Sequence, residues 1–240
     1  MLDPSARRPL DDQWVVPYLS RQQIVAFLPA HTPPNMTGRL PANVRVVDTS
    51  WHVPAPTSGD ATWTQLAQLV ATNDVLLHGS QTPNLSLLEP RAPLDYSLDE
   101  FSKTTAVYAT EDPTWAIAYA VRSASCRGFL NACFYPGEGA GDASERRIFV
   151  SFAANENGPA PLKAGVVYIL PSRNFTRMPS YADPILGLIT ECQFVSTEPV
   201  PVVAEISVQP ANIPLTPLLH DFETVSKRAS LNPLGFPWLH

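Results

Sequence analysis

Short runs of β-branched and aromatic residues follow one another along the central part of this chain, with few helix-like segments between them. Such runs, bounded by glycine, proline and polar residues, are typical of β-strands. The predicted strands are 44–47, 75–77, 106–109, 147–153, 165–170, 194–196 and 202–208. A parallel α/β sheet would need a helix after nearly every strand. The sequence therefore predicts an α+β fold with mixed or antiparallel sheets.

Both ends of the chain are rich in proline, which predicts loops and short elements. There are 26 prolines among 240 residues, dense before residue 60 and after residue 198. Proline fixes φ and removes a backbone donor. Within the first part, residues 22–28 fit a short helix, and residues 63–71 place apolar side chains at helical spacing. We predict an N-terminal extension (1–72) that packs on the core, a core domain (73–215) and a C-terminal tail (216–240).

A second helix is predicted directly after the 106–109 strand. Thr110 is its expected N-cap, because threonine is a favoured residue at that position. The charges of Glu111 and Asp112 suit the positive end of a helix, and the proline that follows is tolerated in the first turn. We expect this helix to continue to about Ser125.

Composition and charge argue against several classes of protein. The formal net charge is −6 and no basic run is longer than two residues, so a surface that tracks nucleic-acid phosphates is not indicated. Three irregularly spaced cysteines and five scattered histidines indicate neither a disulfide framework nor a metal site. No apolar run is long enough to span a bilayer, and the N-terminus lacks a signal-peptide core. We expect no membrane contact, and either a cytoplasmic protein or an effector that is secreted or injected without a classical signal.

Two motifs about thirty residues apart carry the polar groups that are most informative about function. The first reads LLHGSQTPN over residues 76–84, so that an apolar strand ends abruptly in His-Gly-Ser. The second reads VYATEDPTWAIAY over residues 107–119, so that Tyr108 lies at a strand end and Tyr119 in the predicted helix. Unlike polar and aromatic groups at neighbouring strand ends are well placed to line a binding groove. We expect the rings of His78 and Tyr108 to meet along one such groove.

These motifs resemble those of the ADP-ribosyltransferase superfamily, in particular its poly(ADP-ribose) polymerase-like, or diphtheria-toxin-like, branch. There, L-x-H-G-[ST] ends a strand, and a strand-end tyrosine precedes a helix that carries another tyrosine eleven positions later. Tyr108 and Tyr119 have this spacing. A small hydroxyl residue usually stands three positions before the second tyrosine, where this chain has Ala116. The resemblance covers about residues 74–208 and implies a split two-sheet core with few helices, so that 73–215 is the catalytic domain.

The third motif of that branch is a glutamate near the start of a late strand. The corresponding stretch is TECQFVS over residues 190–196, in which Gln193 stands at the expected position. Glutamine can accept a hydrogen bond from the ribose but carries no charge and cannot serve as a base. Glu191 is the alternative, because on one strand both side chains would share a face about 6–7 Å apart. Glu198 and Glu205 are further candidates.

The resemblance also implies a role for each motif residue. His78 would bind the adenosine ribose, Gly79 would pair its amide and carbonyl with the nicotinamide carboxamide, and Ser80 would add a hydrogen bond. Tyr108 and Tyr119 would stack on the two faces of the nicotinamide ring, and Gln193 or Glu191 would bind its ribose. The alternative for each side chain is an ordinary place in the core, in a turn or at an exposed strand end.

The function implied is that of an NAD-dependent mono-ADP-ribosyltransferase, of the kind found among toxins and effectors. It would break the nicotinamide–ribose bond and transfer ADP-ribose to a macromolecular or small-molecule acceptor. An NAD glycohydrolase, with water as acceptor, is a close alternative. Gln193 and Ala116 favour another, a catalytically weak module that binds NAD or ADP-ribose. A last alternative is an unrelated α+β interaction protein.

Overall fold

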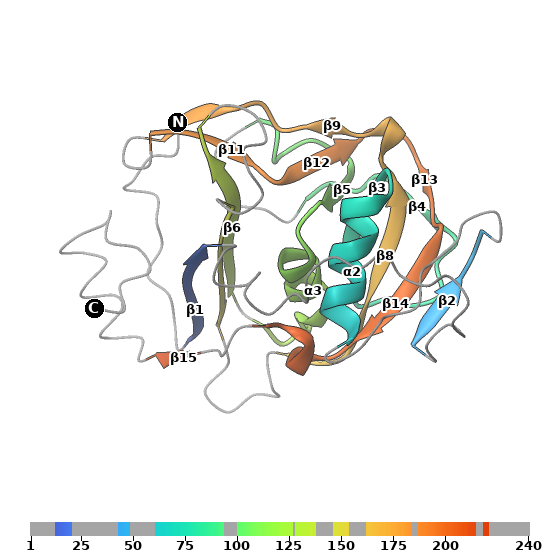
Figure 1. Cartoon of the computed structure of the whole chain (residues 1–240), viewed down its shortest axis with the longest axis horizontal. Coiled ribbons are helices and arrows are strands. Elements are labelled where there is room, and N and C mark those ends of the chain that lie inside the picture. The colour runs from blue at the N-terminus through green and yellow to red at the C-terminus, as the bar shows by residue number, and fades with distance from the viewer. Residues whose placement is uncertain are drawn as a thin grey trace.

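The computed structural model describes residues 13–20, 43–48, 61–93, 100–126, 128–137, 146–153, 162–183, 187–214 and 218–220. Two sheets form its frame, and the helices α2 (Ala61–Thr72) and α3 (Pro113–Val121) lie with them (Figure 1). Helix α3 packs between the two sheets, because its buried side chains share one core cluster with residues from both. The expected α+β class with antiparallel sheets and few helices is confirmed for this part of the chain.

The seven-stranded sheet holds His78, Tyr108 and Gln193, one from each predicted motif. Its order is β2 (Val44–Val46), β14 (Ala204–Val208), β8 (Gly165–Pro171), β3 (Val75–Ser80), β5 (Val107–Thr110), β12 (Gln193–Ser196) and β9 (Thr176–Arg177). Every neighbouring pair is antiparallel. The motif strands β3, β5 and β12 are therefore direct neighbours, although the third lies far along the chain from the first two.

The six-stranded sheet faces the other side of α3. Its order is β10 (Tyr181–Asp183), β11 (Gly187–Glu191), β6 (Gly128–Pro136), β7 (Arg147–Ala153), β1 (Gln13–Ser20) and β15 (Leu218–His220). The remaining short elements are β4 (Leu87–Leu88), which pairs with β13 (Val200–Pro201), and the 3-10 helices η3 (Ser172–Asn174) and η4 (Pro210–Asn212). The sequence did not predict β6, whose glycine, asparagine and alanine have low strand propensity.

The core lies mainly between α3 and the two sheets. All residues of α3 are buried except Tyr119. Helix α2 packs against α3, and the indole of Trp63 donates a hydrogen bond of 2.8 Å to the Thr114 hydroxyl. A second cluster covers the opposite face of the seven-stranded sheet and includes Leu76 and Tyr168. The seven-stranded sheet is thus covered on both faces around its motif strands.

Helix α3 begins later than the sequence predicts. Its N-cap is Asp112, whose carboxylate accepts the main-chain N–H of Trp115 at 2.9 Å. Thr110 is instead the last residue of β5, and its hydroxyl accepts the N–H of Asp112 at 3.0 Å. The prediction of Thr110 as the cap was wrong. Thr110 and Asp112 are both residue types that cap helices, but Thr110 belongs to β5, so Asp112 caps the helix.

The same helix also ends earlier than predicted. It ends at Val121, and Arg122 is extended and forms a β-bridge with Leu162. The hydroxyls of Ser123 and Ser125 then bond to one another at 2.6 Å. Serine competes with a helix by forming such local hydrogen bonds, which explains why helical structure does not reach Ser125.

The described parts of residues 1–72 join the same body as the later chain. Strand β1 pairs with β7 and β15, β2 pairs with β14, and α2 contributes Trp63 and Leu66 to the core. Strand β2 and helix α2 confirm the predictions for 44–47 and 63–71. The short helix predicted at 22–28 lies outside the described residues. The domain boundaries stay a prediction.

Candidate functional site

Strand β3 is paired along its whole length with β8 but at one position only with β5. That single pair is Leu77 with Thr110. Had the antiparallel ladder continued, Gly79 would stand opposite Tyr108, but no register pair forms there. We call this position, Gly79 of β3 and Tyr108 of β5, the ladder break. The first two sequence motifs meet at it.

The main-chain N–H and C=O of Gly79 point toward β5, into the ladder break. Successive residues of a strand direct these groups to alternate edges. In β8 the Ile169 carbonyl accepts a hydrogen bond from the segment that leads into β14, so Tyr168 directs its groups toward His78 of β3. Leu77 and Gly79 therefore direct theirs toward β5. Leu77 is paired there, whereas Gly79 has no register partner.

Position 79 must be a glycine because α3 lies directly against it. A Cβ atom there would meet the Ala116 carbonyl oxygen at 2.1 Å, the Ala120 nitrogen at 2.5 Å and the Cβ of Tyr119 at 2.8 Å. Two of these three atoms belong to the helix backbone and cannot rotate away. The contact places the Cβ of Tyr119 beside Gly79, and the ring of Tyr119 extends to Asn131 of β6.

His78 joins the two motif strands through its imidazole ring. Nδ1 lies 2.6 Å from the main-chain oxygen of Tyr108. A carbonyl can only accept, so Nδ1 carries the hydrogen and Nε2 of the neutral ring is an acceptor. Burial lowers the pKa of His78, the hydrogen bond to Tyr108 opposes this, and the charge of Arg91 lowers it further. The ring, stacked on Tyr168 at 6.4 Å, is therefore neutral at pH 7.

The prediction that the rings of His78 and Tyr108 meet along one groove was wrong, because the two side chains lie on opposite faces of the sheet. Thr110 lies opposite Leu77, so Tyr108, two residues from Thr110, directs its side chain to the face of Leu77 and α3. His78 directs its ring to the opposite face. The phenol oxygen of Tyr108 lies 2.6 Å from the Thr104 carbonyl oxygen. The two residues therefore meet through an imidazole and a main-chain carbonyl.

Gln193, the expected third motif residue, lies close to the second motif. It is the first residue of β12 and pairs with Thr110 of β5. Its side-chain amide donates a hydrogen bond of 3.0 Å to the hydroxyl of Ser102. The Ser102 carbonyl oxygen also lies 2.9 Å from the phenol oxygen of Tyr108. The buried Ser102 thus connects the second motif to the third.

Glu191 lies in the other sheet, so the prediction that it shares a strand face with Gln193 was wrong. The chain leaves β11 at Cys192, whose N–H donates a hydrogen bond of 2.8 Å to the Cys133 carbonyl of β6. Strand β12 then begins in the seven-stranded sheet. The Glu191 carboxylate accepts a hydrogen bond from the phenol of Tyr181 in β10. Glu191 is thus bound to the six-stranded sheet.

Tyr119 is the exposed side chain of an otherwise buried helix, with 37% of its surface accessible. Its hydroxyl donates to the Asn131 side-chain oxygen at 3.2 Å, and the indole of Trp115 donates to the same atom at 2.5 Å. The two rings stand edge to face with centroids 6.1 Å apart. Trp115 is buried in the core cluster, whereas the ring of Tyr119 is partly exposed.

Ser80 completes a local turn after β3. Its hydroxyl accepts the N–H of Thr82 at 3.1 Å. This is the ordinary strand-ending turn that was the alternative for this motif residue. Among the described contacts, none joins the Ser80 hydroxyl to Tyr108 or Gln193, so Ser80 shapes the loop that follows the motif.

Glu205 turns inward, but far from the third motif. It lies in β14, and its carboxylate forms an ion pair of 2.8 Å with Arg45 and accepts the N–H of Asn84 at 2.9 Å. Burial opposes ionisation of Glu205, but these bonds outweigh it and lower its pKa. Glu205 therefore holds the loop of the first motif. Glu198 is exposed and pairs its main chain with the Ser196 hydroxyl.

A carboxylate that the sequence analysis assigned only to a helix end lies beside the third motif. Glu111 follows Thr110, and both of its carboxylate oxygens lie 2.8 Å from Nη2 of Arg177. Arg177 pairs with Phe194 in β12 and stacks on its ring at 4.3 Å. The sequence signal for a role of Glu111 in the site was its position directly after β5. The sequence could not reveal its contact with Arg177, because Arg177 lies far along the chain.

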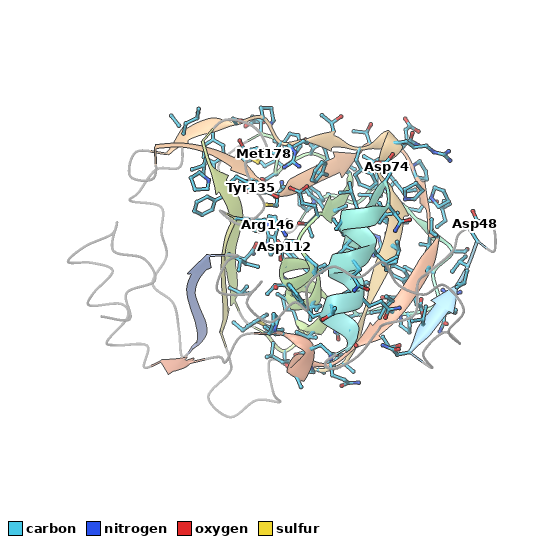
Figure 2. All side chains as sticks on the ribbon, viewed as in Figure 1. Asp48, Asp74, Asp112, Tyr135, Arg146 and Met178 are labelled. Atoms are coloured by element: carbon cyan, nitrogen blue, oxygen red, sulfur yellow. The ribbon has the colours of Figure 1, made fainter. Side chains whose placement is uncertain are left out.

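A buried ion pair fixes the start of α3 behind the site. Arg146 and the capping Asp112 are 2.9 Å apart, and their side chains are 4% and 6% exposed. Figure 2 shows both beside Tyr135, near β6, and the Tyr135 hydroxyl is 3.4 Å from the Arg146 guanidinium. Burial disfavours the charge on Arg146, but Asp112 outweighs this and raises its pKa. Arg146 therefore keeps its charge in the core.

Other kinds of site find no support in the described residues. No group of three or more histidine, cysteine, aspartate or glutamate side chains is placed there to hold a metal ion. None of the helices in that part of the chain combines the length and apolar character needed to cross a membrane.

Comparison with known proteins adds no relative. No family model, no curated protein and no solved structure matches this chain.

Proposed function

We propose that this protein is an NAD-dependent mono-ADP-ribosyltransferase. It would break the bond between nicotinamide and ribose and transfer ADP-ribose to a macromolecular or small-molecule acceptor. The observation that carries the proposal is the ladder break, where the N–H and C=O of Gly79 point to an edge without a register partner. The carboxamide of nicotinamide needs one donor and one acceptor side by side, and one strand residue supplies both.

The order of the strands supports the same proposal. The family that the sequence resembles carries its three motifs on three strands. Here the strands with the corresponding residues, β3, β5 and β12, are consecutive neighbours in one sheet. Two antiparallel sheets with a helix between them fit the split two-sheet core of ADP-ribosyltransferases. Gln193, at the start of β12, lies close to Tyr108 although the two are far apart in the sequence, because both form hydrogen bonds to Ser102.

Two tyrosines are available to flank a flat ring at the ladder break. Tyr108 stands across from Gly79, and Tyr119 contacts the same glycine from α3. A cationic pyridinium gains stacking and cation–π energy on aromatic faces, about 0.5–2 kcal/mol for each contact. His78 keeps Nε2 as an acceptor for a ribose hydroxyl, because its Nδ1–H is bound to Tyr108. The tyrosines would thus orient the nicotinamide ring, and His78 would orient the adenosine ribose.

The proposed reaction needs no general acid for the leaving group. The bond from the ribose C1′ to the pyridinium nitrogen breaks, and its electron pair stays on nicotinamide, which leaves as a neutral base. The acceptor oxygen or nitrogen forms the new bond to C1′ and releases its proton to water. Gln193 can accept the ribose 2′-hydroxyl through its side-chain oxygen, since its nitrogen donates to Ser102. Orientation and electrostatic stabilisation supply the rate.

A second candidate function is a binding module for NAD or ADP-ribose with weak turnover. Gln193 favours it, because an amide cannot balance the positive charge that develops at C1′. Loss of one preorganised electrostatic group costs about a hundredfold or more in rate. Hydrolysis of NAD is the variant in which water replaces the acceptor.

The test is to incubate the protein with NAD labelled in the ADP-ribose half, with and without a cell lysate, and to measure nicotinamide release. Release with lysate, together with labelled macromolecule, supports transfer. Release without an acceptor supports hydrolysis, and binding without release supports the module. Gln193→Glu should raise turnover at least tenfold if position 193 faces the ribose. Wild-type protein that neither binds nor cleaves NAD contradicts the proposal.

A matched pair of variants tests the site itself. Tyr119→Ala removes the exposed ring, whereas Tyr119→Phe keeps the ring and loses only the hydrogen bond to Asn131. If the ring stacks on nicotinamide, the alanine variant binds NAD about tenfold more weakly and the phenylalanine variant binds as the wild type does. Equal affinities of the two variants would remove Tyr119 from the site.

A further inference from the structure

Arg91 occupies the edge of β5 on the far side of the ladder break. Its main chain pairs with Ala106 in both directions, N–H to oxygen at 3.1 Å and 3.2 Å. The same edge of β5 is covered by Leu77 of β3 at Thr110. Tyr108 lies between these two pairs. The ladder break is therefore bounded by β3 at one end and by Arg91 at the other.

The register places the Arg91 side chain on the same face as Tyr108. Residues directly opposite in an antiparallel pair share a face, so Arg91 goes with Ala106. Ala106 and Tyr108 are two residues apart in one extended segment and also share a face. Diagonal neighbours of this kind have Cβ atoms about 7–8 Å apart, within reach of a long side chain. The guanidinium of Arg91 can therefore approach a ligand that contacts Tyr108.

The charge of Arg91 is not neutralised within the described residues. Its side chain is exposed, and no carboxylate of that part of the chain forms an ion pair with it. The arginines at 45, 146 and 177, by contrast, are paired with Glu205, Asp112 and Glu111. The charge of Arg91 also reaches His78, whose pKa it lowers. Among the described residues, Arg91 is thus a cation without an ion-pair partner beside the ladder break.

NAD carries two negative charges on its pyrophosphate, close to both of its riboses. A guanidinium is planar and can donate two parallel hydrogen bonds to phosphate oxygens. On the basis of the proposed function, we infer that Arg91 binds the pyrophosphate of NAD. It thereby sets the direction in which the dinucleotide runs from the nicotinamide at Gly79. Arg177 is unsuited to this role because Glu111 already holds it.

The experiment compares NAD with nicotinamide, which lacks the phosphates, by isothermal titration calorimetry. The variants are Arg91→Ala, Arg91→Lys and Arg173→Ala. Arg173 is an exposed arginine in η3, which follows the end of β8 opposite to Ser80, and it serves as the control. Arg91→Ala should weaken NAD binding about tenfold or more and leave nicotinamide binding unchanged. Arg91→Lys should lose less, and Arg173→Ala should bind both ligands as the wild type does.

The outcomes separate this inference from the proposed function. If wild-type protein binds NAD and Arg91→Ala binds it equally well, the role of Arg91 is overturned and the proposed function stands. If Arg91→Ala loses NAD and nicotinamide to the same extent, Arg91 supports the fold and not the phosphates, and the inference is also overturned. If the wild type binds neither ligand, both proposals fail together.

Discussion

The two edges of β3 differ in kind. Toward β8 the strand is paired from Val75 to Ser80, and all of β8 except Gly165 is buried. Toward β5 it is paired at Leu77 alone. Gly79 is the next residue whose main-chain groups face β5, and it has no register partner there. A continuous ladder satisfies every backbone group internally, whereas an interrupted one leaves groups for a ligand. The β8 edge thus stabilises the sheet, and the β5 edge is where the proposed function requires the ligand to bind.

An edge with a single pair needs other contacts to hold its strands in place. Strand β5 runs directly into α3, and α3 packs on β3 through Gly79. Behind the helix, the Asp112–Arg146 pair fixes its first turn. On the other edge, the Tyr168 hydroxyl and Glu205 hold the loop that follows β3.

The largest expected effect comes from the buried ion pair. Asp112→Ala removes the helix cap and leaves the Arg146 charge buried without a partner. Removing one partner of a buried pair costs about 3–5 kcal/mol of the free energy of unfolding. Asp112→Asn keeps a capping oxygen and should lose less. Urea denaturation measures both, and a loss below 1 kcal/mol for the alanine variant would show that the pair does not support α3.

Gly79→Ala should cause the next largest loss of stability. Its Cβ would overlap the backbone of α3 at Ala116 and Ala120, so the helix must move away from β3. Overpacking of this kind costs about 1–3 kcal/mol, occasionally more. Ser80→Ala, in the same motif, is the control and should change stability by about 1 kcal/mol or less. Thermal denaturation that ranks the two variants equally would mean that α3 is not seated on β3.

The smallest effect is a pH dependence from His78. Burial lowers the pKa of its imidazole, so the unfolded chain binds more protons than the folded one once the pH falls below about 6.5. The free energy of unfolding should therefore be constant in this respect above pH 7 and decrease as the pH falls through 6 and below. His78→Gln should lack this part of the decrease. Parallel pH profiles for the two proteins would contradict a buried neutral His78.

The sequence predicted the strands that have continuous β-branched runs. The 147–153 strand is found at its predicted bounds. The 75–77 strand was predicted to end before His78 but extends to Ser80, because β8 pairs with all three residues of the His-Gly-Ser segment. The sequence missed β6, whose side chains have little strand preference of their own and which is stabilised by β7 and β11 on either side. Local pattern and tertiary pairing agreed in the first case and not in the second.

For the site, the sequence predicted strand ends but not the contacts that join them. It gave no sign that Ser102 would bind both Tyr108 and Gln193, because a loop serine carries no pattern. The sheet change at Cys192, which separates Glu191 from Gln193, depends on a hydrogen bond to a strand far away in the chain. Such features follow from long-range packing, which local periodicity does not encode.

The nicotinamide site is tested by following the amide resonance of Gly79 in a 15N-labelled sample titrated with nicotinamide. We expect this resonance to shift progressively and saturate, because in the proposed site the Gly79 N–H donates to the carboxamide oxygen. The amide of His78, which faces β8, should shift far less. A Gly79 resonance that stays in place while nicotinamide saturates the protein would contradict the claim that the ladder break is the nicotinamide site.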